Sequence, residues 1–71
     1  MINLNNIFKI GYNNLYENSN GFYKLKDEEK NKQNINAAKL LLRIVNKNYN
    51  QLKHWYNINY IQGKLLEFIN Y

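Results

Sequence analysis

The chain has no cysteine, no proline, only three glycines and one histidine among its 71 residues. Without cysteine, neither a disulfide nor a thiolate metal site can support the fold, and the absence also fits a reducing compartment. A chain of this length buries only about 60% of the surface that its unfolded form exposes. We therefore expect its stability to depend on good helix packing, on self-association or on docking to a partner.

Side chains that enzymes use for catalysis are equally scarce. The chain has one serine, Ser19, one histidine, His54, and five acidic residues, three of which follow one another at 27–29. One histidine with scattered carboxylates does not meet the ligand spacing of a zinc or iron site, and the glycines are too far apart to form a phosphate-binding loop. We predict that the protein is not an enzyme and that it holds neither a metal nor a cofactor.

Long apolar runs are also missing. The most apolar stretch, residues 40–45, contains Arg43 and is far shorter than the ~20 residues that span a bilayer. Residues 1–6 lack the basic stretch followed by an apolar core that a signal peptide would have. We expect an intracellular, cytoplasmic protein that does not bind membranes.

What the chain has in abundance is asparagine, lysine, isoleucine and tyrosine, which make up more than half of it. Their codons are rich in A and T, so this composition first reports an A/T-rich genome. The asparagines alternate with apolar residues, and 45% of the chain is hydrophobic, which favours a folded domain over disorder. The net charge of +5 favours negatively charged partners, such as nucleic acid or an acidic protein surface.

Residues 3–17 predict a first helix. Its apolar residues and one glycine recur at helical spacing: Leu4, Ile7, Phe8, Gly11 and Leu15. Asn20 and Gly21 then favour a helix end. The alternative is a β-hairpin, because Phe8, Ile10 and Tyr12 alternate and Asn20-Gly21 can also turn between strands. In the connector, residues 18–26, we expect Phe22 and Tyr23 to fold back onto the core.

A second helix is the most clearly indicated element. Asp27 can cap it, and acidic residues at 28–29 suit the positive end of its dipole. Its main apolar residues follow the helical period: Ile35, Ala38, Leu41, Leu42, Val45 and Tyr49. Ala37, Leu40 and Ile44 widen this stripe to nearly half of the circumference. So wide a stripe predicts contacts on two sides, as in the central helix of a bundle, with Ile35, Leu41, Leu42 and Val45 buried.

The third segment, residues 50–71, is helical but changes phase. Leu52, Trp55 and Tyr56 share one face, whereas a second face, rotated by more than 90°, carries Ile58, Ile61, Leu65, Phe68 and Ile69. Either the helix breaks near residues 57–59 or Gly63, or both faces are buried, one of them against a second chain in a homodimer. Together the three segments predict a single all-α domain, residues 1–71, built as a small bundle of three to four helices.

A line of basic and amide side chains follows the second helix, opposite its apolar stripe. Its members are spaced by three or four residues, with Lys53 as an extension: Lys32, Asn36, Lys39, Arg43 and Lys47. Such side chains can bind successive phosphates or an acidic protein surface. The alternative is an ordinary solvated face of an amphipathic helix in a lysine- and asparagine-rich chain.

A second candidate is the aromatic group Trp55, Tyr56 and Tyr60, which lies beside Lys53 and His54. Aromatic side chains next to cations can stack on bases, and tryptophan and tyrosine also concentrate binding energy at protein interfaces. The alternative is that Trp55 and Tyr56 are simply core residues.

A helix-turn-helix with its turn at residues 46–48 is disfavoured, because its second helix would carry Trp55, Tyr56 and Ile58 instead of a polar reading face. In size, composition and lack of catalytic residues, the chain resembles the short accessory proteins of A/T-rich phages and mobile elements. These include anti-CRISPR and other anti-defence inhibitors, and the resemblance implies an inhibitor or adaptor that occupies a host protein or nucleoprotein. The alternative is a basic nucleic-acid-binding regulatory module that contacts RNA or DNA as a dimer.

Overall fold

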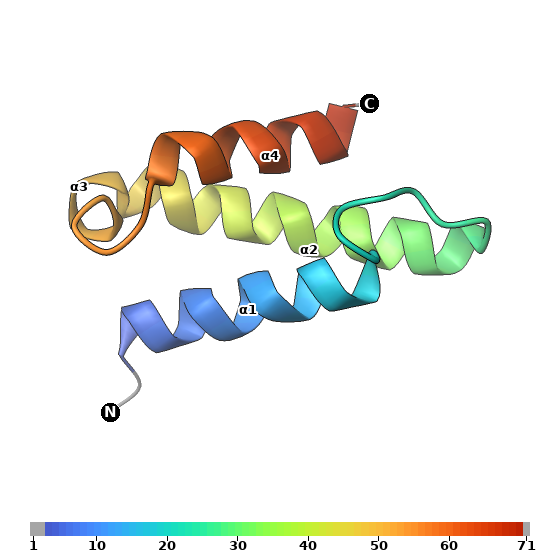
Figure 1. Cartoon of the computed structure of the whole chain (residues 1–71), viewed down its shortest axis with the longest axis horizontal. Coiled ribbons are helices and arrows are strands. Elements are labelled where there is room, and N and C mark those ends of the chain that lie inside the picture. The colour runs from blue at the N-terminus through green and yellow to red at the C-terminus, as the bar shows by residue number, and fades with distance from the viewer. Residues whose placement is uncertain (1–2, 71) are drawn as a thin grey trace.

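The computed structural model describes residues 3–70, so Met1, Ile2 and Tyr71 lie outside the described part of the chain (Figure 1). Its helices form a small all-α bundle, as the sequence predicted. They are α1 (Leu4–Asn18), α2 (Glu28–Lys47), α3 (Tyr49–Leu52) and α4 (Ile58–Asn70). Residues 3–70 contain no strand, so the alternative of an N-terminal β-hairpin is wrong.

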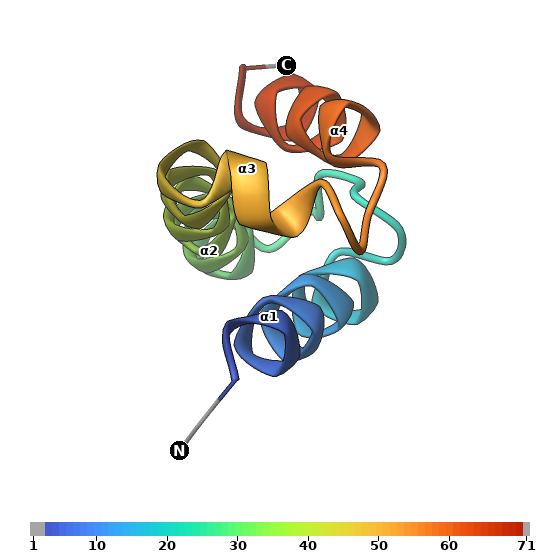
Figure 2. The same cartoon turned by 90° about the vertical axis from the view of Figure 1, so that its left-hand side faces the viewer.

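The central helix of the bundle is α2. Both α1 and α4 run antiparallel to it and pack against it on adjacent sides (Figures 1 and 2). The Asp27 carboxylate accepts the backbone N–H groups of Glu29 and Lys30 at 3.0 and 3.2 Å, which caps the helix start as predicted. Because α1 and α4 pack on two sides of it, the expectation that α2 makes contacts on two sides is confirmed.

One apolar core joins all four helices. Its ten buried residues are Phe8, Leu15, Ala38, Leu41, Val45, Leu52, Ile58, Ile61, Leu65 and Phe68. Of the four α2 residues expected to be buried, Leu41 and Val45 are buried, while Ile35 and Leu42 are partly buried against the core.

The apolar stripe of α2 is wider than the arc that its two neighbours cover. Leu40, expected to widen the buried stripe, is 59% exposed, and Ile7 on α1 is also largely exposed. The expectation that Leu40 joins the core is wrong, because α1 and α4 lie on adjacent sides of α2 and leave the rest of its circumference open (Figure 2). Leu40 lies just outside the covered arc.

The third predicted segment breaks between residues 53 and 57, and this break explains its change of phase. Leu52 from α3 and the apolar residues of α4 enter the same core although they belong to differently oriented helices. Gly63, the other position at which a break was expected, is an exposed position within α4. A second chain is not needed to explain the two apolar faces.

A left-handed turn ends α1. Asn20, Gly21 and Phe22 have φ angles of 53°, 87° and 69°, so Asn20-Gly21 terminates the helix as predicted. The buried Ser19 hydroxyl donates to the Leu15 carbonyl at 2.6 Å and accepts the Phe22 N–H at 2.8 Å. The turn therefore aims the Phe22 side chain at the core.

The two aromatic residues of the connector have different surroundings. The Phe22 ring packs 5.9 Å from the Phe68 ring, as expected for a side chain that folds back. Tyr23, by contrast, is 69% exposed, so the expectation that it too covers the core is wrong.

Among residues 3–70, no helix combines the length and the apolar character that crossing a bilayer requires.

Candidate functional site

The basic ridge comprises Lys32, Asn36, Lys39, Arg43 and Lys47. All five side chains are exposed, and their spacing places them on the face of α2 that points away from the core. The chain has no acidic residue between positions 30 and 66. Beyond its first turn, α2 therefore provides no carboxylate that could neutralise the ridge, and neither does α3.

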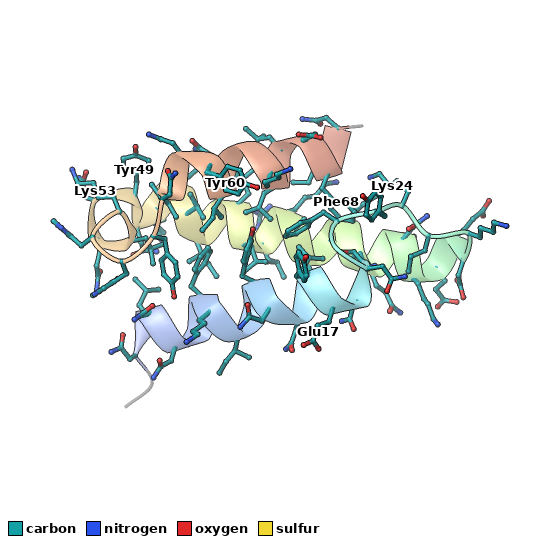
Figure 3. The ribbon with its side chains drawn as sticks, viewed as in Figure 1. Glu17, Lys24, Tyr49, Lys53, Tyr60 and Phe68 are labelled. Carbon is teal, nitrogen blue, oxygen red and sulfur yellow. The ribbon has the colours of Figure 1, made fainter. Side chains whose placement is uncertain are left out.

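Lys53, the expected extension of this line, lies outside α2. It follows α3, and it lies at the end of the bundle that also carries Tyr49 (Figure 3). Because the chain turns at Asn48 before α3 begins, the helical spacing along α2 does not place the Lys53 side chain on the same face as the ridge. Asn46 marks the side of the ridge that meets α4, since its Oδ1 accepts a hydrogen bond from Gln62 Nε2 at 2.7 Å.

The three aromatic residues predicted as partner contacts differ in their surroundings: Trp55 and Tyr60 are exposed, whereas Tyr56 is partly buried. Trp55 is 47% exposed in the turn between α3 and α4. Tyr60 is exposed on α4, and the Lys64 ammonium lies 5.6 Å from its ring centroid. Figure 3 shows Tyr60 on α4.

Tyr56 has a role inside the fold. Its ring meets Phe8 edge-on at 5.3 Å between centroids, and its hydroxyl donates to the Asn5 side-chain oxygen. Burial raises the pKa of the Tyr56 hydroxyl above its ordinary value of about 10, so its proton is retained further into alkaline pH. These contacts tie the α3–α4 turn to α1, and we assign Tyr56 to the fold rather than to a contact surface.

Aromatic rings fill the space between α1 and α4, a feature that the sequence pattern did not predict. The Tyr12 ring lies 5.9 Å from Phe8 and 5.3 Å from Phe22, which continues the row to Phe68. Burial, followed by the proximity of Tyr60 and Tyr16, raises the pKa of the Tyr12 hydroxyl. Phe8 and Tyr12 are four residues apart, which places them on one face of a helix, and this spacing was the one signal for part of the row. Tyr12 entered the prediction only through its alternation with Phe8 and Ile10, which suggested a strand.

A hollow of about 320 Å³ lies between the connector and α4, lined by Gly21, Phe22, Tyr23, Lys24, Lys64, Glu67 and Phe68. The Lys24 ammonium lies 4.5 Å from the Phe68 ring centroid and donates to the Phe68 carbonyl near the end of α4 (Figure 3). A cation at this position satisfies a carbonyl that the helix leaves open and suits the negative end of the dipole. Lys24 therefore clamps the connector onto α4.

Large apolar side chains remain on the surface. Among residues 3–70, eight are exposed: Ile7, Ile10, Tyr16, Tyr23, Leu40, Trp55, Tyr60 and Leu66. Ile7, Ile10 and Leu40 belong to the packed pair α1 and α2, which makes the outer side of this pair a candidate apolar surface. The sequence did contain a sign of it, since the stripe on α2 is too wide for two neighbouring helices to cover.

Within residues 3–70, no cluster of three or more histidine or acidic side chains could hold a metal ion. No family model matches the sequence, and no curated protein or solved structure is significantly similar to the chain. The fold alone therefore defines the class of this protein, a small all-α bundle with α2 at its centre.

Proposed function

We propose that the protein is a non-catalytic binding protein that occupies a protein or nucleoprotein partner, like the small anti-defence inhibitors that it resembles in type. The observation that carries the proposal is the amount of exposed apolar surface. In the described part of the chain, eight large apolar side chains are exposed, against ten in the core. Single exposed apolar residues are normal, but contiguous ones on a small protein mark interaction surfaces.

The basic ridge supports a partner with negative charge. With a net charge of +5 and no acid between positions 30 and 66, the outer face of α2 carries a positive field. Charge complementarity of this kind accelerates association and selects partners more than it adds affinity. The ridge would thus orient an acidic surface, while the apolar side chains supply most of the binding energy.

The second candidate is direct binding of RNA or DNA through the ridge. It is favoured by one observation, the alignment of Lys32, Lys39, Arg43 and Lys47 on a single exposed face. Binding by phosphate contacts alone would leave Ile10 and Leu40 in water. For this reason we place the protein partner first.

Affinity capture with nuclease treatment tests the proposal. The tagged protein would be expressed in cells that naturally carry its gene, and captured material would be compared with and without nuclease digestion. We expect at least one protein to be retained in stoichiometric amount after digestion. Loss of every protein on digestion, together with recovery of RNA or DNA, would contradict the proposal and favour the second candidate.

A further inference from the structure

We infer that the seam between α1 and α2 is a docking surface for an acidic amphipathic helix of the protein partner. This inference rests on the proposed function, and it adds the surface and the chemistry of the segment that binds there. Three features of the described residues carry it: the close packing of the two helices, the apolar side chains that flank it and the charges beside them.

Two contacts fix how α1 lies along α2. A Cβ atom on Gly11 would be 3.0 Å from Leu41 Cδ2, so the glycine lets the two helices approach closely. Further along, the Asn34 amide donates to the Asn18 carbonyl at 3.2 Å. Because the helices are antiparallel (Figure 1), these contacts place Ile7 and Ile10 level with the turns of α2 that contain Leu40 and Ile44.

The apolar seam patch comprises Ile7, Ile10, Leu40 and Ile44. On α1, Ile7 lies one turn from Gly11, and Ile10 extends the surface outward with 61% exposure. On α2, Ile44 lies one turn from Leu41 and is partly buried against the core. Leu40 lies one turn before Ile44 and is more exposed. The patch therefore borders the seam from both helices, with its exposed part on the side that no other helix covers (Figure 2).

Charge differs between the two edges of the patch. On the α2 edge, Arg43 and Lys47 are three and seven residues from Leu40, which places the basic ridge directly beside it. On the α1 edge, three residues one turn from Ile10 are neutral asparagines: Asn6, Asn13 and Asn14. Glu17, two turns from Ile10, is the charged residue of this edge. The surface is thus apolar in the middle and basic along one side only.

A helix with an apolar stripe and acidic residues on one flank matches this surface. Helices of this type bind grooves through apolar residues at positions i, i+3 or i+4, and i+7, while charges beside the stripe set orientation and selectivity. Acidic side chains would face Arg43 and Lys47, and the opposite flank would be neutral where it meets the asparagines of α1.

Other occupants match only part of the surface. A second copy of this chain would bring one carboxylate on this face, Glu17, to the cations of its partner, and each copy carries a net charge of +5. A nucleic acid would neutralise the ridge but would leave Ile10 and Leu40 without apolar contacts. Only a segment that is both apolar and acidic satisfies both parts of the surface.

A peptide-display selection tests the inference even while the identity of the partner is open. Random 16-residue peptides on phage would be selected on the immobilised full chain at about 0.15 M salt. We expect the enriched sequences to share apolar residues at helical spacing with aspartate or glutamate beside them. The strongest would then be made as a free peptide and titrated in solution.

Variants with matched controls locate the binding surface. We expect Leu40→Asn to lower the affinity for the free peptide by about tenfold, the loss typical of a central contact. The control Leu66→Asn, at a leucine that is 41% exposed on α4, should leave affinity within about twofold of the parent. Arg43→Gln combined with Lys47→Gln should weaken binding and reduce its salt dependence, whereas Lys9→Gln combined with Lys26→Gln should do neither. Circular dichroism would confirm that each variant is folded.

Three results would overturn the inference: no enriched peptide, enriched peptides without acidic residues, or equal losses for Leu40→Asn and Leu66→Asn. The captured cellular partner separates this failure from failure of the proposed function. If Leu40→Asn retains that partner at full affinity, the seam is wrong and the protein-binding function stands. If nuclease removes every captured protein, the proposed function itself fails.

Discussion

Ser19 shows how one buried hydroxyl fixes the end of a helix. It lies between the Leu15 carbonyl and the Phe22 N–H, and it is fully buried. We expect Ser19→Ala to lower the free energy of unfolding by about 1–3 kcal/mol, because the Phe22 N–H loses its partner. Urea unfolding measures this loss. Asn13→Ala, at an exposed position of α1, is the control, and an equal effect of both changes would show that the hydroxyl has no special role.

The glycines of α1 and α4 should respond oppositely to alanine. A Cβ atom at Gly63 would have no neighbour within 4 Å, so Gly63→Ala should raise the free energy of unfolding by about 1 kcal/mol through helix propensity. At Gly11 the same atom would meet Leu41 at 3.0 Å, and we expect crowding to cancel the gain. Equal stabilisation in thermal or urea unfolding would contradict the close approach of α1 and α2.

Tyr12 and Tyr56 predict how stability changes at alkaline pH. Burial raises the pKa of both hydroxyls, and for Tyr12 the neighbouring Tyr60 and Tyr16 add to the effect. The unfolded chain, with an ordinary tyrosine pKa of about 10, then loses these protons first. The stability that the two protonated hydroxyls contribute to the fold is fully present below about pH 10 and is lost as the pH rises further. The slope of unfolding free energy against pH above 10 should be shallower in Tyr12→Phe, and an unchanged slope would count against this burial.

At the scale of the elements, two neighbouring leucines of α2 test which part of its stripe is covered. Leu41 is 5% exposed and Leu40 is 59% exposed. Leu41→Ala should cost about 2–5 kcal/mol, the range for emptying a packed core, whereas Leu40→Ala should change stability by less than about 0.5 kcal/mol. Urea unfolding of the two variants gives both values. A large loss at Leu40 would mean that another surface covers it in solution, as in a dimer.

The extent to which the sequence predicts these elements depends on whether local chemistry sets them. The start of α2 and the end of α1 were predictable, because Asp27 and Asn20-Gly21 act on their own backbones. The end of α2 was not, since Tyr49, expected in the second helix, belongs to α3. For the break in the third segment, the sequence offered two positions, residues 57–59 and Gly63. A change of helical phase shows that the helix is interrupted, but it does not show which residues bend. The exposure of Leu40 was not predictable, because it depends on where α1 and α4 lie around α2. The aromatic row required the connector to be placed in space, and sequence spacing carries no such information.

At the scale of the whole molecule, the basic ridge on the outer side of α2 borders the apolar side chains at the seam with α1. The ridge of Lys32, Lys39, Arg43 and Lys47 was predicted correctly as one exposed face, because a single helix sets its geometry. Of Trp55, Tyr56 and Tyr60, the structure leaves the first and the last exposed, whereas Tyr56 packs on Phe8 and so belongs to the fold. A surface that combines apolar side chains with a basic border suits a protein partner better than a phosphate backbone.

Titration of short RNA and DNA with the full chain distinguishes these two kinds of partner. Fluorescence anisotropy would give the affinity over a range of salt concentrations, for the parent chain and for the variant with Lys39, Arg43 and Lys47 all changed to Gln. If the partner is a protein, we expect weak binding without sequence preference at about 0.15 M salt, in the range of 10⁻⁴–10⁻⁶ M that non-specific contacts give. Submicromolar binding at that salt concentration, with a slope of log K against log salt that falls by about one per removed phosphate contact, would show instead that the ridge binds nucleic acid directly.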